Sequence, residues 1–247
     1  MGKHRIYGEN VSIQMENVQK FYDKRASLVE ERGWGAISLG DEDSTIANRV
    51  YDYDRDTLFP KLGLNAQTRV LELGCGMGRW AKIVLPHCRA YCGVDFSEEM
   101  LKAAENICQE YAEKSSFFHL SASDAVEKEP LFYGGAFHCI ILSGVCIYIN
   151  DDVLKRIFEK LPTLAHQHCT ICVKETAALS ERLTLNEFPS EALQSNYDAI
   201  YRTQEEYASI FQPLLSAGFS IHEQYFLPEE VGRKRAETNG LCTIFRR

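Results

Sequence analysis

The sequence predicts an α/β fold in which helices cover both faces of a mostly parallel, seven-stranded sheet. Short apolar runs alternate along the chain with stretches of helical periodicity, as in folds that alternate strands with helices. One of these runs, residues 137–142, is apolar almost throughout, which is typical of a strand buried on both faces. The last two strands follow each other with no helix between them, so we expect an antiparallel hairpin at one end of the sheet.

The first half of the chain is expected to supply a helical preface and three strands. Helices are expected at residues 11–31, 45–62, 77–85 and 98–112, and strands at 69–73, 90–94 and 117–120. Gly33 ends the first helical pattern, and Pro60 lies near the end of the second. Ser97 is the expected N-cap of the fourth helix, because Glu98 and Glu99 occupy the first turn, where the helix dipole favours acids.

The second half is expected to supply four more strands and an insertion. Strands are expected at residues 137–142, 169–174, 219–226 and 241–245, and helices at 151–161 and 205–216. The polar stretch at residues 176–203 is too long for a plain connection, so we expect it to have a function of its own.

Length and charge exclude several classes of protein. The 247 residues are 45% hydrophobic and 25% charged, enough for one sizeable core. The net charge of −8 argues against a protein whose main task is to bind nucleic acid or anionic lipid, because those partners require a basic surface. No apolar stretch approaches the roughly 20 residues of a membrane span, and residues 1–19 lack the apolar segment of a secretory signal. We therefore expect a cytoplasmic protein. The expected oligomeric state is a monomer or a homodimer.

The cysteines predict neither a disulfide framework nor a metal site. They are nine in number and scattered, as expected of reduced, buried thiols. The cluster of His166, His168, Cys169 and Cys172 has the residue types of a zinc site. Because the two cysteines fall in an expected strand, their offset of three places the sulfurs on opposite faces, which favours packing over metal binding.

The strongest local motif is V-L-E-L-G-C-G-M-G-R-W at residues 70–80, where an apolar strand runs into three glycines and a helix begins at once. Glycine permits a sharp turn and lets a ligand approach the backbone closely. Asp95 ends the next strand, where a carboxylate can accept hydrogen bonds from two ribose hydroxyls. Ser123 and Asp124 follow the third strand. Together these positions predict an adenosine-containing cofactor at the carboxyl ends of the strands.

The glycine spacing discriminates between cofactors. A dinucleotide loop has the spacing G-x-G-x-x-G, whereas here Arg79 stands where the third glycine is required. Glu72 lies two residues before the loop and would repel a pyrophosphate, but an acid there suits a cofactor that carries an ammonium and a sulfonium. These residues argue against a nicotinamide dehydrogenase.

At these positions the chain resembles the class I S-adenosylmethionine-dependent methyltransferases, over roughly residues 45–247. That family combines an acid followed by G-x-G-x-G, an acid ending the second strand, an aspartate near adenine and an antiparallel last strand, and all four have counterparts here. The resemblance implies a Rossmann-like fold and S-adenosyl-L-methionine as the cofactor. The cofactor-binding residues it implies are Glu72, Gly74, Cys75, Gly76, Arg79, Asp95, Phe96, Ser97, Met100, Ser123, Asp124, Ala125 and Ser143.

Within this set the resemblance implies distinct contacts. Gly74 and Gly76 would pass the methionyl part, Asp95 would hold the ribose, and Asp124 would accept a hydrogen bond from the adenine amine. Arg79 has two open interpretations. It pairs with the methionine carboxylate, as in some branches of the family, or it is a solvated residue of the helix that follows the glycines.

The N-terminal segment F-Y-D-K-R-A, residues 21–26, resembles the cap that closes over the cofactor in many small-molecule methyltransferases. Tyr22 and Arg25 are three residues apart and share one helical face, so both join the expected cofactor-binding residues. Trp34 opens a loop that would complete a helical lid and exclude water from the sulfonium. The alternative is that Tyr22 and Trp34 are core aromatics.

The acceptor should lie beyond the fourth and fifth strands, and a hydroxyl acceptor needs a base or a hydrogen-bond acceptor for its proton. Glu175 is the first candidate for that carboxylate, and Tyr148 is a candidate for the wall of the acceptor pocket. The alternatives are a surface acid for Glu175 and a core aromatic for Tyr148.

The insertion adds Tyr197, Tyr201 and Arg202, which combine aromatic faces with a guanidinium and so suit a sugar, phosphate or carboxylate. The alternative for Arg202 is a structural pair with an acid such as Asp198. The segments at residues 181–184 and 195–203 resemble a methyltransferase group associated with bacterial capsule and surface-polysaccharide pathways.

We therefore expect methyl transfer to an oxygen of a small polar acceptor, an anionic or sugar-linked building block of a surface polysaccharide. One alternative is a protein α-N-terminal methyltransferase, from which the chain departs at Tyr148, where that family has its catalytic histidine. The other is a non-catalytic cofactor-binding subunit. The chain is expected to form one domain, with a cap (1–44), a cofactor-binding core (45–175), an acceptor-site insertion (176–203), and a last helix with the terminal hairpin (204–247).

Overall fold

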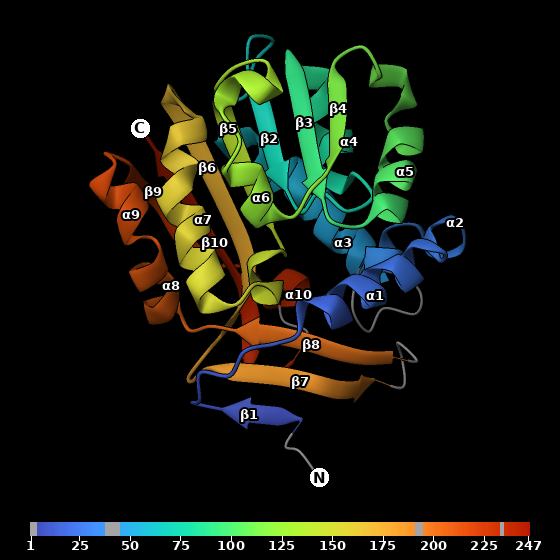
Figure 1. The fold of residues 1–247 in the computed structure, drawn as a ribbon, viewed down its shortest axis with the longest axis vertical. Coiled ribbons are helices and arrows are strands. Elements are labelled where there is room, and N and C mark those ends of the chain that lie inside the picture. Colours follow the sequence, from blue (N-terminus) through green and yellow to red (C-terminus); the bar gives the residue numbers. More distant parts are fainter. Residues whose placement is uncertain (1–3, 38–44, 191–194, 233–234) are drawn as a thin grey trace.

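A seven-stranded sheet forms the centre of the molecule (Figure 1). The computed structural model describes residues 4–37, 45–190, 195–232 and 235–247. In spatial order the strands are β4 (Ser115–His119), β3 (Ala90–Asp95), β2 (Arg69–Leu73), β5 (Phe137–Ser143), β6 (Ala165–Ala178), β10 (Thr238–Arg246) and β9 (Ser220–Phe226). The first five are parallel, and β10 is antiparallel to both β6 and β9. The mostly parallel sheet with a terminal antiparallel hairpin is confirmed.

Helices pack on both faces of this sheet. They include α3 (Thr45–Tyr53), α4 (Arg79–Val84), α5 (Glu98–Ile107), α6 (Ala122–Val126), α7 (Asp151–Leu164), α8 (Gln204–Ile210) and α9 (Gln212–Ser216). One apolar cluster joins the sheet to α6 through α9, and a second joins the opposite face to α4 and the segment after α3. Cys169 belongs to the first cluster and Cys172 to the second, so the two sulfurs lie on opposite faces as the strand offset predicts.

Several expected helices differ in detail. The helical path from Thr45 to Leu62 changes pitch, with α3 followed by a π-helical turn at Asp54–Leu58 and a 3-10 turn at Phe59–Leu62. The helix expected at residues 98–112 ends at Ile107, and a 3-10 turn follows it. The helix expected at 205–216 is divided into α8 and α9, because Pro213 has no N–H to continue the first of them.

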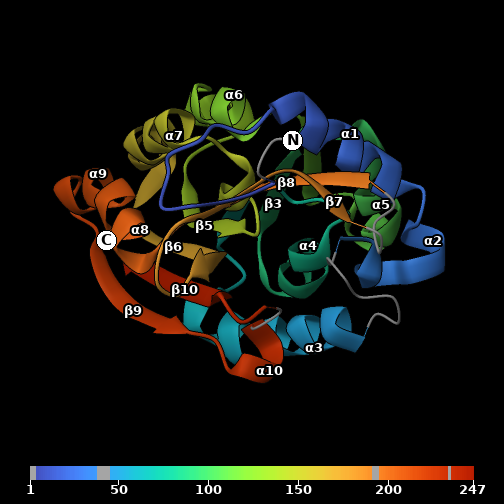
Figure 2. The same cartoon turned by 90° about the horizontal axis from the view of Figure 1, so that it is seen from below.

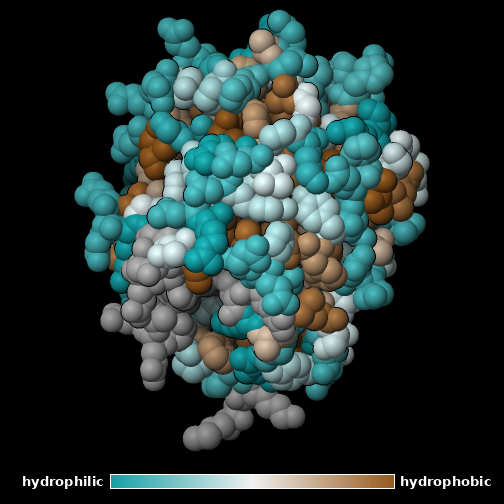
Figure 3. Space-filling view, turned by 180° about the vertical axis from the view of Figure 1, so that it is seen from behind, coloured by the Kyte–Doolittle hydropathy of each residue, from teal (hydrophilic) through white to brown (hydrophobic). Residues whose placement is uncertain are grey.

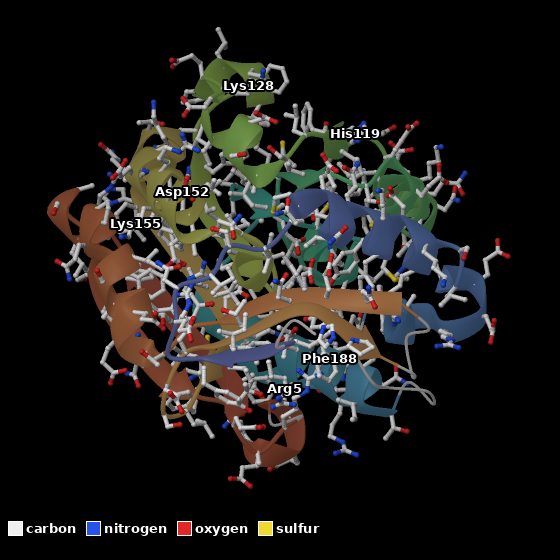
Figure 4. The ribbon with its side chains drawn as sticks, turned by 60° about the horizontal axis from the view of Figure 1, so that its bottom comes forward. Arg5, His119, Lys128, Asp152, Lys155 and Phe188 are labelled. Atoms are coloured by element: carbon white, nitrogen blue, oxygen red, sulfur yellow. The ribbon has the colours of Figure 1, made fainter. Side chains whose placement is uncertain are left out.

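A second, three-stranded sheet was not predicted. Its order is β1 (Arg5–Tyr7), β7 (Leu183–Ser190) and β8 (Ser195–Tyr201), all antiparallel, so the insertion is mainly a β-hairpin. Arg5 and Phe188 lie next to each other on it (Figure 4). The pairing of β7 with β8 shifts register between Leu185 and Phe188, where Glu187 has a φ of +49°.

The N-terminal segment packs against this second sheet. The expected helix at residues 11–31 is divided into α1 (Met15–Ala26) and α2 (Val29–Arg32), with a 3-10 turn at Gly33–Ile37. Val18 and Phe21 of α1 are buried in one cluster with residues of β7 and β8. Seen from below, α1 and the second sheet cross the same end of the main sheet (Figure 2). Residues 38–44 of the expected lid lie outside the described residues.

The rear surface is mainly hydrophilic, with apolar side chains interspersed (Figure 3). None of the helices in the described ranges combines the length and apolar composition of a bilayer span.

Candidate active site

A cavity of about 440 Å³ lies where the carboxyl ends of β2, β3, β5 and β6 meet the N-terminal segment and the second sheet. This volume falls within the range of small-ligand sites. The expected site residues that line it are Tyr22, Glu72, Gly74, Cys75, Gly76, Arg79, Asp95, Phe96, Ser143, Tyr148, Glu175 and Tyr201. The structure thus brings the two halves of the expected site, cofactor and acceptor, into one space.

The glycine loop runs along the floor of this cavity. Gly74, Gly76 and Gly78 all have positive φ, at +76°, +51° and +85°. A Cβ at Gly74 would lie 2.6 Å from the Val145 side chain, so the loop after β5 leaves room for glycine alone. The sharp turn expected from the motif is confirmed.

Asp95 ends β3 and lines the cavity beside the glycine loop. One carboxylate oxygen accepts the N–H of Gly76 at 2.8 Å, and the other accepts the N–H of Ser97 at 3.0 Å. Burial raises the pKa of Asp95 to about 6, although these N–H groups act against the rise. Each oxygen keeps lone-pair capacity for a further donor, as binding to two ribose hydroxyls requires.

The pKa of Glu72 lies further above its ordinary value than that of Asp95. The Glu72 carboxylate is buried in β2 and accepts a hydrogen bond from the Tyr91 hydroxyl at 2.5 Å. Burial raises its pKa to about 8. A cationic ligand group beside it would favour the ionised form, so the carboxylate suits an ammonium group.

Glu72→Gln is expected to stabilise the protein at high pH. A carboxyl whose folded pKa is raised contributes stability that is complete below its unfolded pKa, near 4.5, and is lost as pH rises through about 8. Each unit of difference between the folded and the unfolded pKa corresponds to about 1.4 kcal/mol of stability. Melting of both ligand-free proteins at pH 5 and pH 9 measures this effect. The advantage of the variant should grow toward pH 9, and an advantage independent of pH would contradict the account.

Arg79 belongs to a buried ionic cluster that the sequence did not reveal. Its guanidinium pairs with Asp54 in the π-helical turn and donates to the Ser143 hydroxyl at 3.2 Å. Lys174 of β6 also pairs with Asp54, at 2.5 and 2.6 Å. The Arg79 side chain is only 13% exposed and lines the cavity, so the solvated-surface interpretation is wrong. With two cations against one acid, this wall suits an anionic ligand group.

Glu175 lines the cavity and keeps one carboxylate oxygen without a hydrogen-bond partner among the described residues. Its Oε1 accepts the N–H groups of Val145 and Cys146, both at 3.0 Å. Its Oε2 is buried and has no hydrogen-bond partner in the part of the chain that the structure describes. The residue is 3% exposed, so the surface-acid alternative is wrong, and burial raises the pKa of the carboxyl. A buried unpaired carboxylate oxygen is costly, and a ligand donor would relieve that cost.

A row of tyrosines forms another part of the cavity wall. The hydroxyls of Tyr148 and Tyr197 lie 3.1 Å apart, and those of Tyr197 and Tyr201 lie 3.4 Å apart. The ring of Tyr22 meets that of Tyr148 edge-on at 5.2 Å. Tyr148 and Tyr201 both line the cavity, whereas Tyr197 is buried behind them.

Three residues assigned to cofactor binding lie behind the cavity wall. Arg25 donates to the carbonyls of Gly35, at 2.7 Å, and Ala36, and so holds the turn that carries Trp34 into the cavity wall. Ser97 caps α5 and donates to Asp23 of α1 at 2.6 Å. Met100 is buried beneath α1. These positions support the lid and the Asp95 loop rather than lining the cavity.

Ser123, Asp124 and Ala125 also lie outside the cavity lining, in α6. Asp124 is exposed, and its carboxylate accepts a hydrogen bond from the Ser121 hydroxyl at 2.7 Å. The adenine contact that the resemblance implies for Asp124 stays a prediction.

The structure contradicts the acceptor-site role expected for Arg202. Arg202 does not line the cavity but is fully buried, where its guanidinium pairs with Asp151 and donates to the carbonyls of Cys146 and Ile149 at 2.8 and 2.5 Å. All three nitrogens are engaged, and the acid is Asp151 rather than Asp198. Sequence reasoning missed this partner because it lies 51 residues away.

We expect Arg202→Ala to destabilise the fold by about 3 to 5 kcal/mol, as is typical when one partner of a buried pair is removed. Denaturant unfolding at neutral pH measures this loss. Retained stability together with weakened acceptor binding would instead restore the acceptor-site role.

Comparison with known proteins agrees with this geometry. A methyltransferase domain family matches residues 71–169, which include the end of β2, the glycine loop and β3 through β5. The chain matches no curated protein sequence.

Solved structures share the fold along nearly the whole chain. Phosphoethanolamine N-methyltransferase 1 of Haemonchus contortus, bound to phosphoethanolamine and S-adenosylhomocysteine, is 15% identical with a TM-score of 0.71 over 94% of this chain and 48% of its own. Magnesium protoporphyrin IX methyltransferase of Synechocystis with bound S-adenosylmethionine is 16% identical with a TM-score of 0.63 over 97% of this chain and all of its own.

A third structure holds a different small acceptor. It is 1,6-didemethyltoxoflavin-N1-methyltransferase of Burkholderia thailandensis, with bound 1,6-didemethyltoxoflavin and S-adenosylhomocysteine. It is 15% identical, with a TM-score of 0.62 over 98% of this chain and 95% of its own. At such identities the likeness establishes the fold, and the fold expected from the sequence is confirmed.

Proposed function

We propose that this chain, an S-adenosyl-L-methionine-dependent methyltransferase of the class I fold, methylates an oxygen atom of a small polar acceptor that hydrogen-bonds to Glu175. The observation that carries the acceptor assignment is the buried, unpartnered Oε2 of Glu175 in the cavity wall. A hydroxyl placed there would satisfy that oxygen and give up its proton to it.

The donor set of the cavity fits S-adenosyl-L-methionine. The lone pairs of Asp95 suit the ribose hydroxyls, Glu72 suits the methionine ammonium, and Arg79 with Ser143 suits its carboxylate. A pyrophosphate would instead meet the acids of β2 and β3. When bound, the cofactor supplies an electrophilic methyl group.

The chain's own residues prepare the acceptor. The N–H groups of Val145 and Cys146 fix the orientation of Glu175 through Oε1 and leave Oε2 for the acceptor. Its raised pKa makes the carboxylate a stronger base than an exposed glutamate. Trp34 and Tyr148 line the cavity and help to keep water from the reacting atoms.

The size of the cavity supports a small acceptor, and two proteins of the same fold bind small acceptors, namely phosphoethanolamine and 1,6-didemethyltoxoflavin. A sugar-linked or phosphate-bearing building block of a surface polysaccharide is the compound class we favour. That choice depends on the resemblance of residues 181–184 and 195–203 to methyltransferases associated with bacterial capsule and surface-polysaccharide pathways. These segments lie largely in β7 and β8, so they shape the acceptor side of the molecule.

A screen with methyl-labelled S-adenosylmethionine tests the proposal. The panel contains sugars, sugar phosphates, nucleotide sugars, small amines and a peptide with a free amino terminus. We expect label in a hydroxyl-bearing small molecule. Transfer to the peptide alone would replace the proposal with the peptide alternative, and S-adenosylhomocysteine binding without any transfer would favour a non-catalytic subunit.

A further inference from the structure

Arg235 is a cation in the cavity wall that sequence reasoning did not single out. It follows α10 (Glu229–Gly232), lines the cavity and donates from Nη1 to the hydroxyl of Tyr201 at 3.0 Å. Its guanidinium lies over the rings of Tyr201 and Phe188, 5.9 and 6.0 Å from their centroids. Two aromatic faces and one hydroxyl therefore hold the guanidinium in position before any ligand arrives.

Arg235 differs from the other cations that line the cavity because they form ion pairs with a buried aspartate. Arg79 and Lys174 both pair with Asp54. For Arg235 no ion pair occurs among the residues that the structure describes, and the nearby Glu237 pairs with Arg5 at 2.5 Å. A half-buried guanidinium that shares Glu237 with Arg5, has no close ion pair of its own and is fixed in geometry is suited to bind an oxyanion with two parallel hydrogen bonds.

The position of Arg235 relative to Glu175 defines the shape of the ligand. Both residues adjoin the pairing of β6 with β10, in which Glu175 pairs with Leu241 and Ala178 with Thr238. Thr238 in turn bridges to Arg235. Three residues of strand span roughly 10 Å, so the backbone at Arg235 lies well beyond Glu175 on the side of the second sheet.

We propose that Arg235 is the anion-binding residue of the acceptor site, and that the acceptor carries a carboxylate or phosphate on a different part of the molecule from the methylated group. The anion pairs with Arg235, while the methylated group meets Oε2 of Glu175. This inference rests on the proposed function and identifies the substrate class. It moves the anion site from Arg202, whose guanidinium is already engaged, to Arg235.

The test uses inorganic phosphate as the probe and protein saturated with S-adenosylhomocysteine, so that the cofactor half of the cavity is filled. Calorimetry should show phosphate binding to this complex, weakened roughly 10- to 100-fold in Arg235→Gln, the range expected for a hydrogen bond to a charged group. Glutamine keeps a donor for the Tyr201 hydroxyl but removes the charge. In the labelled-methyl screen, a sugar phosphate should be methylated in preference to the matched free sugar, and Arg235→Gln should abolish that preference.

Arg246→Gln is the matched control. It makes the same change of charge at the opposite end of β10, where Arg246 donates to the Lys61 carbonyl at 3.0 Å outside the cavity, so phosphate affinity should not change. Phosphate affinity equal in wild type and Arg235→Gln, or no phosphate binding to the wild-type complex, would overturn the anion site. Failure of the wild type to bind S-adenosylhomocysteine would instead count against the proposed function, so the two failures are distinguishable.

Discussion

Replacement of Glu175 with glutamine is expected to lower kcat by about 100- to 10,000-fold, the range that a positioned general base contributes. The amide has the same shape, and its carbonyl can still accept the N–H groups of Val145 and Cys146, so the loop after β5 should keep its place. What the variant loses is the ability of Oε2 to take the acceptor proton. Binding of S-adenosylhomocysteine should change less than twofold.

Stability separates this effect from damage to the fold. Because burial raises the pKa of Glu175, the ionised carboxylate lowers stability once pH exceeds its folded pKa, and the glutamine variant should then be at least as stable as the wild type. The measurements are steady-state kinetics with the acceptor found in the screen and melting of both proteins. Glu110→Gln, at an exposed pair with Lys82, is the control. An unchanged kcat in Glu175→Gln would rule out the proton-accepting role.

Asp95→Ala is expected to weaken binding of S-adenosylhomocysteine by about 1 to 3 kcal/mol, which corresponds to roughly 5- to 150-fold in the dissociation constant. The substitution removes the two acceptor oxygens assigned to the ribose. It also leaves the N–H groups of Gly76 and Ser97 without their carboxylate partner, which loosens the glycine loop.

Isothermal titration of the wild type and the variant measures this loss. Asp152→Ala is the control, since Asp152 is exposed on the outer face of α7, away from the cavity (Figure 4). Affinity that survives in Asp95→Ala would mean that the ribose is held elsewhere.

Local sequence rules were sufficient for the centre of the site. The glycines follow β2, Asp95 ends β3 and Glu175 lies near the carboxyl end of β6, and the carboxyl ends of parallel strands converge at one edge of a sheet. Once the strands were placed, the convergence of these residues on one cavity followed from topology. The antiparallel last strand was predictable because its connection to β9, which holds only the short helix α10 (Glu229–Gly232), is too short for the crossover that a parallel pair needs.

The missed features depend on contacts between distant parts of the chain. Asp54 meets Lys174 across 120 residues, and Arg202 meets Asp151 across 51. Arg235 reaches the acceptor wall only because Tyr201 arrives there on β8, in a sheet that also requires β1 from the N-terminus. Hydrophobic periodicity carries no information about such pairings between distant parts of the chain.

We propose that this cavity binds S-adenosylmethionine and uses its methyl group. Calorimetric titration of the purified protein with S-adenosylhomocysteine and, separately, with NAD decides between the two kinds of cofactor. We expect S-adenosylhomocysteine to bind with a micromolar dissociation constant and to raise the melting temperature through preferential binding to the folded state. We expect no binding of NAD, because Glu72 lies beside the loop that would have to hold its pyrophosphate. Binding of NAD without binding of S-adenosylhomocysteine would contradict the claim.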